Sequence, residues 1–275
     1  MEIEPLSFVG VHTHELYMDG NDDLFGGHLW YNGEQLNTWR HYIWCLRHTE
    51  ILDTIIKPTE GFLNDYSFVR DNAGNMYWVE RFTVSRFKKK TKGGIIITLA
   101  EGKFKDIRWM YASSKGELYF IDLVDLYKID LNGKYHLLAK NLAQHTASFG
   151  WLGDDKHSLF GIWTDKNNNV YVANYSGQVV KRINAAGKVE NAVYSTSPWS
   201  PTGGIFDDEG NLWLLEASIT NEVRVRKIKK DALMKGNKFK AYTTNNILPV
   251  GIVAGIFSLF ILFARKMVVR KRKEK

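Results

Sequence analysis

The sequence has little cysteine, few prolines and almost no recognisable catalytic signature, and these shortages exclude several classes of protein. The single cysteine, Cys45, excludes an internal disulfide and any cysteine-cluster metal site. It lies in the apolar run "HYIWCLR", which predicts a buried small side chain rather than a reactive thiol. The sequence contains no phosphate-binding loop, dinucleotide fingerprint or nucleophile elbow. Enzymes that depend on those motifs are therefore excluded.

Positive charge is also scarce outside the C-terminal end. The formal net charge is +7, but residues 265–275 alone contain seven Lys or Arg and one Glu. The rest of the chain is therefore nearly neutral and lacks the basic surface that contacts phosphates. We expect no nucleic acid partner.

The C-terminal end predicts a membrane anchor. Residues 247–264, "ILPVGIVAGIFSLFILFA", are eighteen residues without a charge, and the basic run follows them. As a helix they would extend about 27 Å, close to the thickness of a hydrocarbon core. The expected organisation is a folded domain (1–244), a transmembrane helix (245–264) and a basic tail (265–275).

Orientation follows from the position of the basic residues. The positive-inside rule places the tail in the cytoplasm and the domain outside, in a single-pass membrane protein. The start, "MEIEPLSFVGVHTHE", has no export signal, so we expect the natural N-terminus to lie further upstream. Three alternatives remain: a buried core helix, a cytoplasmic domain whose tail is translocated against the rule, or a sorting signal beginning at "LPVG" (248–251) and cut off after export.

What the chain does have is aromatic residues (13%) and a recurring turn. "DNAGNMYWVER" (71–81) returns as "DKNNNVYVANY" from Asp165 and as "DDEGNLWLLEA" from Asp207. An aromatic anchor follows each turn, with spacings of 52, 42, 52 and 42 residues between the anchors Phe25, Tyr77, Tyr119, Tyr171 and Trp213. Asp, Asn and Gly are the residues that tight hairpins require.

Each unit contains four short strand-like runs. A four-stranded sheet of that length cannot bury its faces alone, whereas a ring of such sheets can. The sequence therefore predicts an all-β fold, a β-propeller with five visible blades.

Two segments resemble the NHL and SMP-30/gluconolactonase-like family of propellers: "GIWTDKNNNVYVANYSGQVVKRINAAGKV" (161–189) and "TGGIFDDEGNLWLLEAS" (202–218). The similarity covers roughly residues 8–244. Such propellers usually have six blades, so the resemblance implies one further blade upstream, and a five-bladed ring is the alternative.

Equivalent positions on the inner strands are polar. Seven residues before the first residue of each turn stand His12, Asn64, Asp106, Ser158 and Ser200. Two residues later, on the same face of a regular strand, stand His14, Tyr66, Arg108, Phe160 and Thr202. From these rows we predict a ligand site at the channel mouth, formed by Asn64, Tyr66, Asp106, Arg108, Ser158 and Ser200.

The segment "HTHE" predicts a metal site within that ring. His12, His14 and Glu15 offer nitrogen and oxygen ligands for a divalent ion such as calcium. The family resemblance implies a metal held by a Glu, an Asn and an Asp, and Glu15 matches the Glu. Where the other ligands are expected the sequence has Gly161, Gly203, Ser158 and Ser200, so no catalytic residue is carried over.

Two functions follow from these residues. The first is a membrane-anchored binding or scaffolding propeller for a small-molecule or protein ligand. The alternative is a calcium-dependent lactonase- or esterase-like hydrolase with a metal in the channel. A second aromatic cluster (26–44) either stacks on sugar or peptide or packs between blades.

Overall fold

The computed structural model describes residues 12–18, 21–30, 40–49, 51–56, 62–63, 68–81, 83–145, 158–220 and 222–234. The chain forms two compact units, Met1–Lys238 and Phe239–Lys275, and every described residue belongs to the first. The predicted membrane span lies outside the described residues. Within the described ranges no helix is long and apolar enough to cross a membrane, and α1 (Lys230–Met234) has five residues.

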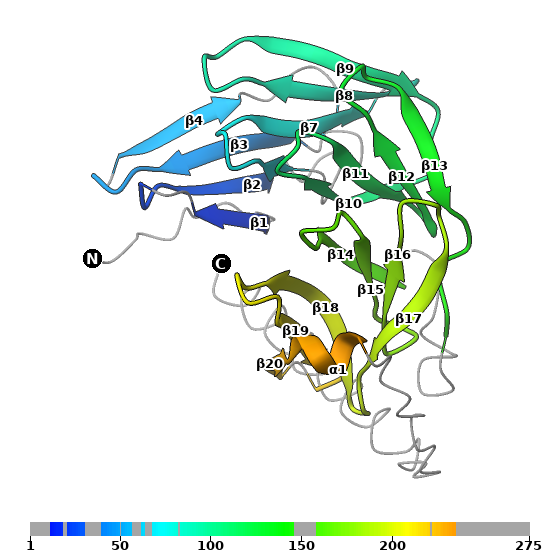
Figure 1. The fold of residues 1–275 in the computed structure, drawn as a ribbon. Coiled ribbons are helices and arrows are strands. Elements are labelled where there is room, and N and C mark those ends of the chain that lie inside the picture. Colours follow the sequence, from blue (N-terminus) through cyan, green and yellow to red (C-terminus); the bar gives the residue numbers. More distant parts are fainter. Residues whose placement is uncertain are drawn as a thin grey trace, which may run out of the picture. The chain divides into compact units, whose positions relative to one another are not determined.

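The strands form five antiparallel sheets, one for each predicted unit, so the predicted β-propeller with five blades is confirmed (Figure 1). Blade 1 contains β1 (His12–Met18), β2 (Leu24–Trp30), β3 (Arg40–Leu46) and β4 (Leu52–Ile56). Blade 2 contains β5 (Phe62–Leu63), β6 (Val69–Arg70), β7 (Met76–Arg81), β8 (Ser85–Lys90) and β9 (Ile96–Gly102). Both β5 and β6 pair with β7 as an interrupted inner strand.

The remaining blades follow in chain order. Blade 3 contains β10 (Ile107–Ala112), β11 (Leu118–Asp122), β12 (Asp125–Ile129) and β13 (Tyr135–Ala139). Blade 4 contains β14 (Leu159–Thr164), β15 (Val170–Asn174), β16 (Val179–Ile183) and β17 (Val189–Tyr194). Blade 5 contains β18 (Trp199–Phe206), β19 (Leu212–Ser218) and β20 (Val223–Ile228). The inner strands of successive blades are neighbours: β6 contacts β1 and β10, β10 contacts β14, and β14 contacts β18.

Strand register agrees with the repeat alignment made from the sequence. In four blades the residue after the predicted polar position pairs with the residue three places after the aromatic anchor. The pairs are Thr13 with His28, Ile107 with Asp122, Leu159 with Asn174, and Pro201 with Glu216. The spacings of the anchors therefore report structural equivalence in these four blades, whereas in blade 2 the corresponding Glu80 pairs with Leu63.

The repeated turn is held by the side chain of its first residue. Asp71 accepts hydrogen bonds from the backbone N–H of Asn75 and the hydroxyl of Tyr77, both at 2.8 Å. The corresponding Asp residues of blades 4 and 5 accept equivalent bonds from an Asn N–H and from the polar tip of the aromatic anchor. The recurring motif thus closes the hairpin and fixes its anchor.

Replacing Asp71 by alanine is expected to lower the free energy of unfolding by about 1 to 3 kcal/mol. The change leaves the hydroxyl of Tyr77, a residue that is 1% exposed, without its acceptor. Urea unfolding of the variant measures the loss. Asp208→Ala is the control, because Asp208 is an exposed turn residue and should change stability by less than about 0.5 kcal/mol. Equal losses in the two variants would contradict the role given to Asp71.

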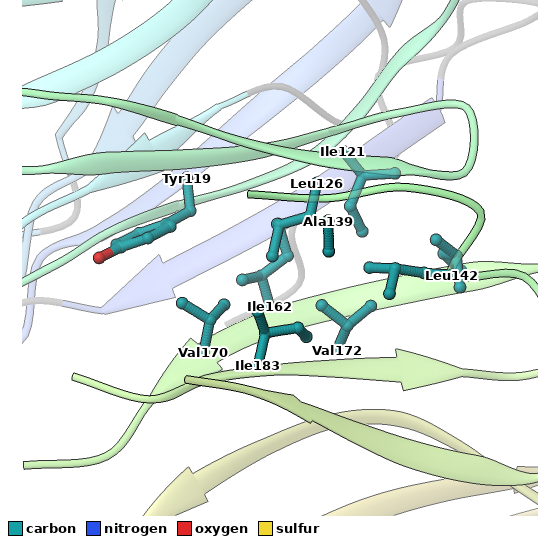
Figure 2. Close-up of a cluster of buried hydrophobic side chains, with 10 residues drawn as sticks. Tyr119, Ile121, Leu126, Ala139, Leu142, Ile162, Val170, Val172 and Ile183 are labelled. Carbon is teal, nitrogen blue, oxygen red and sulfur yellow. The ribbon is translucent and has the colours of Figure 1, made fainter. Parts of the chain in front are cut away.

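Adjacent blades bury apolar faces against each other. Figure 2 shows the cluster between blades 3 and 4, where Ile121 and Leu126 point toward Ile162, Val172 and Ile183. Similar clusters join blades 1 and 2, blades 2 and 3, and blades 4 and 5. Cys45 belongs to the first of these and is fully buried, which confirms its predicted packing role. Burial raises the pKa of its thiol.

One apolar face of blade 5 is exposed in the described part of the chain. In blade 4 the anchor Tyr171 is 4% exposed and packs toward blade 5, whereas its counterpart Trp213 is 40% exposed. The other exposed apolar side chains of blade 5 are Ile205, Leu215, Ile219, Val223 and Val225. The aromatic anchor is therefore buried in blade 4 and exposed in blade 5.

Candidate functional site

The candidate site lies at the ends of the blades where the inner strands begin. There the structure brings Asp106 and Arg108 together, with Arg108 Nε donating to Asp106 Oδ2 at 2.9 Å. Both side chains are about four-fifths buried, at 18% and 20% exposure. The backbone N–H of Asp106 donates to Asp122 Oδ1 at 2.7 Å, which fixes the start of β10 against the end of β11. The pair is a largely buried polar element at this end of blade 3.

The two predicted serines are placed further inside. Ser158 and Ser200 are both fully buried, so neither presents its hydroxyl to solvent. The carbonyl of Ser158 accepts hydrogen bonds from the backbone N–H groups of Tyr175 and Ser176. The Oγ of Ser200 has no hydrogen-bond partner in the described part of the chain. The polar row predicted from the sequence is therefore partly a buried wall.

The other predicted site residues are not described at the level of their side chains. Asn64 and Tyr66 lie outside the described residues. His12, His14 and Glu15 belong to β1, but only their backbone is described. No group of three or more His, Cys, Asp or Glu side chains that could hold a metal occurs among the residues with described side chains.

The inner hairpins of blades 1, 3, 4 and 5 share an irregularity just after the predicted polar position. In blades 1, 3, 4 and 5 the register shifts because the inner strand carries one more residue than its partner. Such bulges bend a strand and re-aim its side chains, and they are enriched beside functional sites. The extra residues fall at 14–15, 109, 160–161 and 202. The regular alternation used to place His12 and His14 on one face is therefore interrupted at this point.

Trp109 occupies the bulge of blade 3 in a left-handed backbone conformation, with φ of 50°. A bulky residue rarely adopts that conformation, and the cost is about 1 to 3 kcal/mol. The corresponding positions in blades 4 and 5 are Gly161 and Gly203. At Gly161 an added Cβ would lie 2.7 Å from the carbonyl oxygen of Thr202, so close contact with β18 excludes a side chain.

The family resemblance implies a metal ion held by a Glu, an Asn and an Asp. The positions expected to hold its Asn and Asp ligands are occupied by glycine and by buried serine. Neither kind of residue matches a carboxylate or amide ligand, and Gly161 cannot be enlarged without moving β18. The described residues therefore do not fit the family's Glu, Asn and Asp set.

Three aromatic rings lie in sequence across the start of blades 3 and 4. The rings of Trp109 and Phe160 have centroids 5.4 Å apart, and those of Phe160 and Tyr175 are 5.0 Å apart. All three side chains are partly exposed. Burial raises the pKa of the Tyr175 phenol. We call these residues the aromatic trio; it offers ring faces and edges for stacking.

Sequence reasoning missed a second polar row at the same end of the blades. It lies three residues after each aromatic anchor and contains His28, Glu80, Asp122, Asn174 and Glu216. The last three are buried, and Nδ2 of Asn174 donates at 3.0 Å to the carbonyl of Leu142 in the connection from blade 3. The row was visible in the alignment, because all five residues are polar within otherwise apolar strands. Asp122, Asn174 and Glu216 hold strand ends together, whereas Glu80 accepts a hydrogen bond from Trp78 on its own strand.

Glu216 is the most elaborate member of this row. It is fully buried, and its Oε1 accepts bonds from Ser195 Oγ at 2.5 Å and Arg226 Nη2 at 2.8 Å. Its Oε2 accepts from Arg224 Nε at 2.8 Å. Burial alone would raise the pKa of this carboxyl, but the bonds from Ser195, Arg226 and Arg224 outweigh it, so the pKa lies below its usual value. Arg226 Nη2 also donates to the carbonyl of Tyr194, which connects blade 5 to blade 4.

No family model and no curated protein matches the sequence. Solved structures match the fold. Virginiamycin B lyase from Staphylococcus aureus superposes with a TM-score of 0.51 at 14% identity, over 78% of this chain and 70% of that chain. A streptogramin B lyase gives 0.50 at 14% identity, over 78% and 67%. A protein of unknown function from Bacteroides thetaiotaomicron gives 0.51 at 13%, over 78% and 57%.

The chain has the β-propeller fold of these proteins. A gluconolactonase-like protein is a further structural neighbour, with a TM-score of 0.48 at 11% identity. At these identities the likeness concerns the fold alone, because one propeller can support many unrelated functions. Function has to be argued from the residues at the site.

The aromatic cluster predicted in the β2–β3 hairpin is described only at its base. There Trp44 lies against Gly26, where an added Cβ would approach the indole to less than 2.5 Å. Trp44 is partly buried, so at this position the cluster packs within its own blade. The side chains of Trp30, Tyr31, Trp39, His41 and Tyr42 lie outside the described residues.

Proposed function

We propose that this protein is a binding module whose ligand surface is the end of blades 3 and 4 carrying the aromatic trio. The observation that supports the proposal most is Trp109, a large aromatic residue held at φ 50° in a bulge of an inner strand. Strain of this kind persists where the surrounding structure enforces it, and it is concentrated at ligand sites. The ring of Trp109 lies beside that of Phe160, so the two rings form one aromatic surface.

The chemistry of this surface favours a ligand with an apolar face and polar edges, such as a carbohydrate or a peptide. Aromatic faces stack on such ligands, and polar groups beside them set the orientation. Arg108, on the same strand as Trp109, and Asp106, directly before that strand, provide a donor and an acceptor. The predicted contribution of Asn64 and Tyr66 from blade 2 stays part of the proposal.

The alternative is a lactonase- or esterase-like hydrolase that uses the "HTHE" segment. In its favour, His14 and Glu15 fall in the bulge of β1, at the slot that Trp109 occupies in blade 3. The described residues supply no second and third ligand of the family type, so we derive no catalytic step. Calcium or another divalent ion enters only in this alternative.

One experiment separates the two functions. The full chain is incubated with panels of oligosaccharides, peptides, esters and lactones, and bound compounds are recovered and identified by mass spectrometry. A binding module returns its ligand unchanged. Products that accumulate with time in the presence of the wild type, but not with Glu15→Gln and not in protein-free controls, would support the hydrolase and overturn the binding proposal.

We also propose that residues 245–264 anchor the propeller in a membrane, with the domain outside and the tail from Arg265 in the cytoplasm. The proposal rests on the eighteen uncharged residues followed by the basic run. Carbonate extraction of membranes from cells expressing the chain should leave the protein in the pellet. A chain ending at residue 244 should be released. Release of both would contradict an anchor, and a mass loss C-terminal to "LPVG" would favour the sorting alternative.

A further inference from the structure

We propose that Arg224 and Trp199 form a binding site for a carboxylate group on blade 5. The guanidinium of Arg224 lies over the indole of Trp199, with Cζ 4.3 Å from the ring centroid. The Arg224 side chain is 34% exposed and Trp199 is partly exposed, so the pair is accessible from solvent. The site shares no residue with the aromatic trio and goes beyond the function proposed for it.

Arg224 is not required to neutralise Glu216. Arg226 already reaches both oxygens of that carboxylate, with Nη2 to Oε1 at 2.8 Å and Nε to Oε2 at 3.2 Å. A carboxylate can only accept hydrogen bonds, and Arg226 also supplies the donor that reaches the Tyr194 carbonyl in blade 4. The connection between blades is therefore complete with one arginine. The second arginine leaves the cluster with a net charge of +1.

The geometry prepares that extra charge for a ligand. The Nε bond to Glu216 at 2.8 Å fixes the guanidinium from one side, and the face of Trp199 fixes its plane. Within the described residues, Nη1 and Nη2 of Arg224 make no hydrogen bond, so both remain available. Two parallel N–H groups of a guanidinium match the two oxygens of a carboxylate.

The charge of the cluster selects the class of ligand. A net charge of +1 is balanced by one carboxylate, whereas a phosphate dianion would need a further cation. Arg226, the nearest candidate, already spends its Nε and Nη2 groups on Glu216 and Tyr194. The indole of Trp199 adds an apolar surface beside the anion, so an aromatic or aliphatic carboxylate should bind better than acetate.

Fluorine NMR of 4-fluorobenzoate tests the site directly, with the full chain of 275 residues purified in mild detergent. We expect line broadening with the wild type and about tenfold weaker binding or more with Arg224→Gln. The matched control is Arg182→Gln. Arg182 also lies on the third strand of its blade, is 34% exposed and pairs with a glutamate, Glu190. It should leave the broadening unchanged.

Further arms decide between the remaining explanations. Arg224→Lys keeps the positive charge but loses the two parallel N–H groups of the guanidinium, so it should bind 4-fluorobenzoate more weakly than the wild type. This variant tests the site if Arg224→Gln fails to fold. Broadening of the neutral 4-fluorobenzamide to the same extent would show that only the ring is recognised and would overturn the proposal. Displacement by phosphate but not by acetate would overturn the assignment to carboxylates. Broadening that is lost in Trp109→Gly but kept in Arg224→Gln would place the probe at the aromatic trio and would overturn the proposal, so failure here is distinguishable from failure of the proposed binding function.

Discussion

Replacing Glu216 by alanine is expected to lower the free energy of unfolding by about 3 to 5 kcal/mol, because breaking a buried ion pair leaves its partner's charge uncompensated. The carboxylate is fully buried and is bonded by Ser195, Arg224 and Arg226. Without it Arg226 keeps its bond to the Tyr194 carbonyl but loses its counter-charge. The link between blades 4 and 5 is then held by a charge that the surrounding strands cannot balance.

Urea unfolding of the variant and of Glu209→Ala measures this effect against a solvent-exposed glutamate. Glu209 is 79% exposed, so its replacement should change the free energy of unfolding by less than about 0.5 kcal/mol. A loss below about 1 kcal/mol in Glu216→Ala would show that the cluster is solvated and that its hydrogen bonds contribute little.

The same carboxyl predicts an acid-sensitive part of the stability. The folded-state pKa of Glu216 lies below its usual value, while the unfolded value is about 4.3. Its contribution is therefore fully present above about pH 4.3 and is lost as the pH falls through the folded pKa. The difference in unfolding free energy between the wild type and Glu216→Gln should shrink below about pH 4. A constant difference from pH 3 to pH 7 would contradict this assignment.

Replacing Phe120 by alanine is expected to cost about 3 to 5 kcal/mol, the range for a large aromatic side chain lost from a packed core. Phe120 is fully buried between blades 2 and 3. Its ring is 4.5 Å from that of Phe87 and 5.1 Å from that of Phe104, and it stacks on Tyr127 at 5.2 Å with planes 9° apart. Removal therefore opens a cavity bordered by three rings that cannot all move inward.

Leu215→Ala is the control for this prediction. Leu215 is 41% exposed on the open face of blade 5, so its replacement should cost less than about 1 kcal/mol. Urea unfolding of both variants gives the comparison. Similar losses at Phe120 and Leu215 would mean that the face of blade 5 is covered in solution, and a small loss at Phe120 would mean that the interface between blades 2 and 3 is loosely packed.

The blades were predictable from the sequence because their signals are local. Asp71 and Asn75 make their turn bonds within five residues, and the aromatic anchor Tyr77 follows two residues later. The interacting residues therefore form one short motif in the sequence. Repetition at fixed spacing then identified the propeller. The second polar row could have been found by the same alignment, since Asp122, Asn174 and Glu216 stand at one aligned position.

The bulges could not be predicted in the same way. An extra residue lengthens the spacing between anchors by one, but the inner strands of blades 1, 3, 4 and 5 all carry one, so comparing the spacings does not reveal it. The left-handed conformation of Trp109 and the close approach of Gly161 to Thr202 depend on neighbouring blades and leave no local trace. The burial of Ser158 and Ser200 could not be predicted for the same reason. The sequence of an inner strand does not show whether a polar residue faces the channel mouth or is covered by a neighbouring blade.

The most direct measurement is binding of the full chain to glycan and peptide arrays, compared between wild type and Trp109→Gly. Glycine relieves the strain at φ 50°, which offsets part of the packing lost with the indole, so the variant should fold. Tyr135→Ala removes an exposed aromatic residue from the outer strand β13 and serves as the control. We predict a set of wild-type signals that Trp109→Gly weakens at least about tenfold and Tyr135→Ala leaves intact. Signals that survive in a folded Trp109→Gly would contradict a ligand surface at the aromatic trio.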